Sequence, residues 1–66
     1  MQLDTYLTQT GTTEHAFAAL IGVKQSAVNK YRHGDRMPKP AILQKITEVT
    51  DGKVTANDFV AKVAGR

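Results

Sequence analysis

The 66-residue sequence predicts an all-α fold, a compact bundle of five short helices in one domain that spans residues 1–66. Apolar residues recur with the three- and four-residue spacing of amphipathic helices, and no stretch shows the strict alternation typical of a strand. Glycines, prolines and an Asp-Gly step divide the chain into short segments. One mixed alternative stays open, a β-hairpin over residues 50–64, because Asp51-Gly52 is a hairpin-type dipeptide.

The first two predicted helices have clear ends. The first covers residues 2–10, stops at Gly11 and carries an apolar stripe of Leu3, Tyr6 and Leu7. Thr12 or Thr13 caps the second, since a hydroxyl accepts from the open backbone N–H groups. Gly22 ends the second helix in left-handed backbone, which glycine adopts without a Cβ clash. Within this helix we expect inward-facing side chains at Phe17, Ala18, Leu20 and Ile21.

The third predicted helix begins at Gln25 and ends at position 32 or 33. Val28 and Tyr31 lie three residues apart and are expected to face the core, while the opposite face is polar and basic. Together with the second helix and the turn at Gly22, this layout over residues 13–34 is typical of a helix-turn-helix, whose second helix reads DNA.

Two further helices complete the predicted bundle. Gly34 closes the third helix, residues 35–39 form a loop, and Pro40 suits the first turn of the fourth helix. The amphipathic pattern of the fourth helix consists of Ile42, Leu43, Ile46 and Val49. Thr55 caps the fifth helix with Asp58 three residues later, a variant of the capping box. The apolar residues of this last helix are Phe59, Val60 and Val63.

Positive charge is concentrated in one segment of the chain. The net charge is +3, yet residues 24–39 hold five basic residues against the single acid Asp35, and the rest of the chain has a slight acidic excess. A basic cluster on and beyond one helix is the pattern expected of phosphate contacts. The five basic residues are Lys24, Lys30, Arg32, Arg36 and Lys39.

Composition excludes several other classes of protein. The chain has no cysteine, which excludes disulfides and thiolate zinc sites and favours a reducing compartment. No apolar run approaches a membrane span, and the N-terminus does not resemble a signal peptide, so we expect a cytoplasmic protein. The only histidines are His15 and His33, and no nucleophile–base pair is recognisable. We therefore expect no enzyme activity, no metal and no cofactor.

The candidate site residues follow from the predicted third helix. Its N-terminal turns place four side chains on one face, where amides and lysines would reach base edges in the major groove. These candidate base-contacting residues are Gln25, Ser26, Asn29 and Lys30. Open amides at the start of the second helix and nearby cations are candidates for phosphate contact. The phosphate-contacting candidates are Thr12, Thr13, Lys24, Arg32, Arg36 and Lys39.

The stretch GVKQSAVNKYRHGDR resembles the helix-turn-helix of phage Cro proteins. Ala18, Gly22 and Val28 fall at the three positions that define that motif. The tail ILQKITEVTDGKVTANDF is similar to YdaS-type regulators of the Cro superfamily, small all-helical proteins of bacteria and prophages. This second resemblance covers nearly the whole chain and implies a lambda-repressor-like fold. The first implies operator contacts by the four candidate base readers and by Arg36.

Both resemblances imply a sequence-specific regulator of double-stranded DNA. The expected activity is Cro-like repression by occlusion of promoters, with a homodimer on a palindromic operator. The alternative is an antitoxin-like or protein-interaction partner in a phage-control or toxin–antitoxin pair, because YdaS-type proteins resemble members of such pairs.

Overall fold

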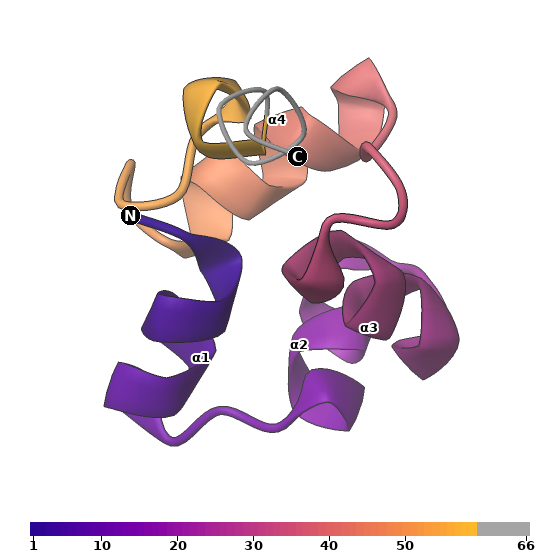
Figure 1. Cartoon of the computed structure of the whole chain (residues 1–66), viewed down its shortest axis with the longest axis vertical. Coiled ribbons are helices and arrows are strands. Elements are labelled where there is room, and N and C mark those ends of the chain that lie inside the picture. Colours follow the sequence, from indigo (N-terminus) through magenta and orange to yellow (C-terminus); the bar gives the residue numbers. More distant parts are fainter. Residues whose placement is uncertain (60–66) are drawn as a thin grey trace.

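The computed structural model describes residues 1–59, and these form a helical bundle without strands (Figure 1). The complete helices are α1 (Leu3–Thr10), α2 (Glu14–Ile21), α3 (Gln25–His33) and α4 (Pro40–Val49). A fifth helix begins at residue 56 and is described as far as residue 59. The all-α prediction is thus confirmed, and a hairpin is wrong for the described part of residues 50–64. Val60 and Val63 lie outside the described residues.

Local sequence signals set the ends of α2. The Thr13 hydroxyl caps it by accepting a hydrogen bond from the backbone N–H of Ala16 at 3.0 Å. Gly22 ends the helix with a φ of 74°, in the left-handed region that the sequence predicted. A Cβ at Gly22 would meet only the Lys45 Nζ, at 3.6 Å, so backbone conformation and not space requires glycine there.

The core gathers between α1, α2 and α3 and extends to α4 and the following segment (Figure 1). Phe17 is 1% exposed and meets the Tyr6 ring edge-on, with 6.2 Å between the ring centroids. Leu20 is 60% exposed, so the prediction that it faces inward is wrong. The buried stripe of α2 passes through its neighbours instead, and consists of Phe17, Ala18 and Ile21.

The end of α4 also differs from its sequence pattern. Ile46 is fully buried, whereas Val49 is 36% exposed despite its place in the amphipathic repeat. The next residue, Thr50, is buried instead: its hydroxyl donates to the Ile46 carbonyl at 2.7 Å and accepts from the Val54 backbone N–H at 3.1 Å. This polar link turns the chain at the end of α4, and it leaves Val49 on the outer side.

The start of the fifth helix closes the bundle against the N-terminus (Figure 1). The Thr55 backbone N–H donates to Asp58 Oδ2 at 2.9 Å, which confirms the predicted capping interaction. The Gln2 side-chain amide donates to the Asp58 carbonyl at 3.2 Å, and Phe59 is buried. These contacts hold the two ends of the described chain together, and α2 and α3 pack against the bundle that results.

Candidate nucleic-acid interface

Helix α3 is anchored by one face and leaves the other open. Val28 is fully buried and Tyr31 is 5% exposed, so both pack into the core as the sequence predicted. The turn from α2 is closed by a hydrogen bond from the Val23 N–H to the Ala18 carbonyl at 3.0 Å. The side chains of Gln25 and Ser26 are exposed at the N-terminal end of α3. The two helices and their turn therefore form the predicted helix-turn-helix.

The four candidate base readers divide into two rows on this open face. Ser26 and Lys30 are one helical turn apart and exposed, and their side chains have no hydrogen-bond partner among residues 1–59. Gln25 and Asn29 form the parallel row, closer to α2, and both donate side-chain hydrogen bonds to the carboxylate of Glu14. One row is thus open to a ligand, and the other is held in place by the protein.

Glu14, at the first position of α2, is the centre of a polar network. Its Oε1 accepts from Gln25 Nε2, and its Oε2 accepts from Asn29 Nδ2 at 3.0 Å and from Arg32 Nη1 at 3.0 Å. The hydrogen bond from Asn29, followed by those from Gln25 and Arg32, lowers the pKa of Glu14 below its usual range despite partial burial. The carboxylate is therefore ionised at neutral pH, on the face predicted to meet DNA.

Arg32 is engaged inside the protein. Its Nε donates to Asp4 Oδ1 at 2.9 Å, and Nη2 binds the same oxygen, while Nη1 binds Glu14. These hydrogen bonds, that to Asp4 first, raise the pKa of Arg32 above its already high value. A phosphate would have to displace two carboxylates to bind this guanidinium, so the arrangement argues against the phosphate role predicted for Arg32.

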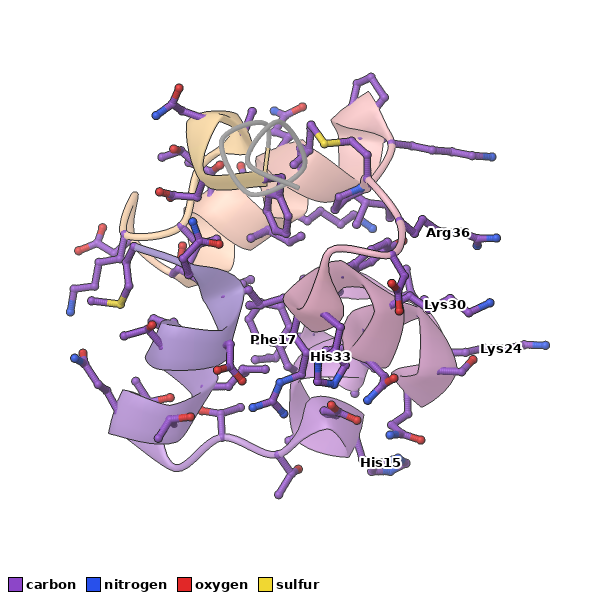
Figure 2. The ribbon with its side chains drawn as sticks, in the orientation of Figure 1. His15, Phe17, Lys24, Lys30, His33 and Arg36 are labelled. Carbon is purple, nitrogen blue, oxygen red and sulfur yellow. The ribbon has the colours of Figure 1, made fainter. Side chains whose placement is uncertain are left out.

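The remaining cations share one flank of α3. Lys24, Lys30 and Arg36 project from the same side of the molecule, outward from α3 and the loop that follows it (Figure 2). The loop is fixed to the end of α3, since the Asp35 N–H donates to the Lys30 carbonyl at 2.9 Å. Lys39, directly before α4, is exposed as well. The structure thus brings Lys24, Lys30 and Arg36 together on one flank and separates Arg32 from them.

The two threonines before α2, Thr12 and Thr13, make different hydrogen bonds. The Thr12 N–H donates to the Leu7 carbonyl at 3.1 Å, and its hydroxyl shares a hydrogen bond of 2.7 Å with Thr10. Thr13 uses its hydroxyl as the cap of α2. At the predicted phosphate seat, the backbone N–H groups that find no acceptor in the described chain are therefore those of Thr13, Glu14 and His15.

Beside the cationic flank lies a cleft of about 520 Å³ between α3, the loop and α4. Its apolar wall combines the exposed face of the turn with the loop side of α4, and two cations stand at its edge. The lining residues are Val23, Ala27, Tyr31, Arg36, Met37, Lys39 and Ile42.

Sequence reasoning missed Glu14. The one local signal was its place directly after the cap, where an acid suits the positive end of a helix. Its partners lie 11, 15 and 18 residues further along the chain, so its role depends on how α2 crosses α3.

Other kinds of site find no support in the part of the chain that the structure describes. No group of three or more metal-ligating side chains occurs within residues 1–59. His15 and His33 are both exposed, on α2 and at the end of α3 (Figure 2). No described helix has the length and apolar character needed to cross a membrane.

Comparison with known families agrees with this geometry. A family model described as helix-turn-helix, of the Cro/C1 type, matches residues 4–56, from α1 to the start of the fifth helix. No curated protein and no solved structure matches the chain. The match supports the function of a DNA-binding transcriptional regulator. The chain belongs to the Cro/C1-type helix-turn-helix family of DNA-binding domains.

Proposed function

We propose that this protein is a Cro-like repressor that places α3 in the major groove of a double-stranded operator. The observation that carries the proposal is the combination of an open polar face at the start of α3 with Lys24, Lys30 and Arg36 on one flank. An α-helix fits the major groove, and cations beside it meet the phosphates on either side.

In this arrangement the two rows of side chains on α3 have different roles in DNA contact. Ser26 and Lys30 reach base edges directly, and Lys30 is suited to guanine. Gln25 and Asn29 contact bases with the parts of their amides that Glu14 leaves unoccupied. Phosphate contacts come from Lys24, Arg36 and Lys39, with Thr12 and Thr13 beside the open amides of α2. Arg32 supports the reader from within the protein.

The short length of α3 favours binding as a dimer, and a dimer on its operator would act as a repressor. One short helix covers only a few base pairs, so we propose that two copies bind a palindromic operator as a homodimer, with half-sites about 34 Å apart. Such a complex would repress by covering a promoter in the cytoplasm, without contact to any further protein.

Selection of bound duplexes from a randomised pool, followed by titration of the selected duplex, tests this proposal. We expect a palindromic consensus, two copies of the chain per duplex, and binding at least about a thousandfold tighter than to a scrambled duplex at physiological salt. A pool that shows no enrichment would contradict sequence-specific binding. Enrichment of a single unpaired half-site would contradict the homodimer alone.

The cleft beside the loop favours a second candidate, an antitoxin-like or protein-interaction role. Its apolar wall includes Met37, which is 39% exposed, and Arg36 and Lys39 at its edge would suit an acidic partner. Because the cleft shares these cations with the proposed DNA surface, a partner bound there would compete with DNA. Met37→Glu should abolish partner binding if this role holds, and equal partner binding by the variant would contradict it.

A further inference from the structure

We propose that Glu14 is a specificity-determining residue that orients the amides of Gln25 and Asn29, so that α3 prefers adenine to guanine at the bases they face. Glu14 acts as a positioning residue, because its own carboxylate is turned toward protein donors. The inference rests on the proposed function, since it concerns how the same surface distinguishes base pairs.

The first step is the chemistry of the carboxylate. An ionised carboxylate only accepts hydrogen bonds, so each amide must turn its NH₂ group toward Glu14 and its carbonyl oxygen away from it. The observed contacts have this sense: Gln25 donates through Nε2 and Asn29 through Nδ2. One carboxylate thus fixes the same orientation in both amides.

The second step concerns the hydrogen-bonding groups that remain free on each amide. After one N–H is given to Glu14, the carbonyl oxygen and the second N–H remain, and neither amide oxygen has a partner among residues 1–59. Adenine presents an N6 amino donor beside the N7 acceptor in the major groove, and an amide meets both with one acceptor and one donor. The residual pattern of Gln25 and of Asn29 therefore complements adenine.

Guanine would require an amide that donates two hydrogen bonds. It presents two acceptors, O6 and N7, in the same place. To donate twice, an amide would have to give up its hydrogen bond to Glu14 or rotate its carbonyl oxygen against the carboxylate. Both changes cost the complex energy, because a charge-assisted hydrogen bond is lost or two acceptors are opposed. Glu14 therefore penalises guanine without touching DNA.

The third step is that the carboxylate is itself held. Arg32 bridges Glu14 and Asp4, with Nη1 at 3.0 Å from Glu14 Oε2 and Nε at 2.9 Å from Asp4 Oδ1. The Glu14 side chain is 14% exposed, so water has limited access to replace its protein partners. The orienting group is thus fixed by α1, α2 and α3 together.

Glu14→Gln tests the inference, because a glutamine of the same shape offers both an acceptor and a donor and supports either amide orientation. The matched control is Asp35→Asn, which removes one negative charge from the exposed loop of the same surface. The assay is the affinity for the selected duplex and for duplexes with A·T to G·C changes at the positions facing Gln25 and Asn29. Circular dichroism confirms that both variants are folded.

We expect the adenine-over-guanine affinity ratio to fall at least about fivefold in Glu14→Gln and to stay at the wild-type value in Asp35→Asn. Both variants should bind all duplexes more tightly, because each loses a negative charge near phosphates. A ratio that is equally unchanged in both variants would overturn the role of Glu14 while leaving the proposed function intact. A wild-type chain without preference for any duplex would overturn the proposed function itself.

A second measurement needs no variant. Purine lacks the N6 amino group of adenine. Replacing the contacted adenine by purine therefore removes the N–H donor from which the oriented amide oxygen accepts a hydrogen bond. Wild-type affinity should fall at least about fivefold. An unchanged affinity at both positions would overturn the inference, because the amide oxygens would then not face the base.

Discussion

Two neighbouring residues of α2 allow a matched test of how this helix packs. Ile21→Ala and Leu20→Ala remove the same number of carbon atoms from adjacent positions, yet Ile21 is fully buried and Leu20 is 60% exposed. For Ile21, transfer of the lost atoms at about 0.8 kcal/mol per carbon, together with the cavity left behind, gives a loss of roughly 2–5 kcal/mol. For Leu20, with less than half of the side chain buried, we expect a loss below about 1 kcal/mol.

Urea denaturation followed by circular dichroism measures both losses. A domain of this size is stable by roughly 3–10 kcal/mol, so the Ile21→Ala variant should be near the limit of folding, and Leu20→Ala should resemble the wild type. The slope of the unfolding free energy against urea should stay constant in any variant that folds. Equal shifts of the two midpoints, or a larger shift for Leu20→Ala, would refute the packing of α2 described above.

Three further predictions concern the DNA surface, the polar network and the turn. Lys24→Gln and Arg36→Gln should each weaken binding to every duplex and reduce the slope of log K against log salt by about one, whereas Lys53→Gln, in the turn after α4, serves as the control; unchanged slopes would rule out the phosphate role. Because the pKa of Glu14 is lowered in the folded state, its stabilising charge is complete at neutral pH and is lost as the pH falls through that lowered pKa. Glu14→Gln should therefore flatten the acid limb of the stability–pH curve, and coincident limbs would contradict the network. Gly22→Ala should cost about 1–2 kcal/mol in thermal unfolding, because alanine disfavours a left-handed φ, and an unchanged midpoint would contradict this conformation.

Much of the fold could be predicted from the sequence because its signals are local. The cap at Thr13, the left-handed Gly22, the start of α4 at Pro40 and the pairing of Thr55 with Asp58 each depend on residues within one turn of each other. Such signals act before the chain is compact, so they do not depend on tertiary packing.

The incorrect predictions concern residues whose burial or contacts depend on how one helix packs against another. Periodicity identifies an apolar stripe but not its centre. It predicts an inward-facing Leu20 and places Val49 in the amphipathic pattern of α4, whereas the structure buries Ile21 in α2 and the hydroxyl of Thr50 at the end of α4. The polar network could not be predicted for the same reason. Glu14 meets its partners only because α2 packs against α3, and that packing is not encoded in any short stretch.

The central claim, that the N-terminal part of α3 contacts the major groove, is tested most directly by an NMR titration of the ¹⁵N-labelled chain with the selected duplex. We expect the largest amide shift changes over residues 24–30 and at Arg36, Met37 and Lys39, with intermolecular contacts from Ser26 and Lys30 to base protons of the major groove. Shift changes confined to α1 and α4, with the amides of residues 24–30 unmoved, would contradict the claim.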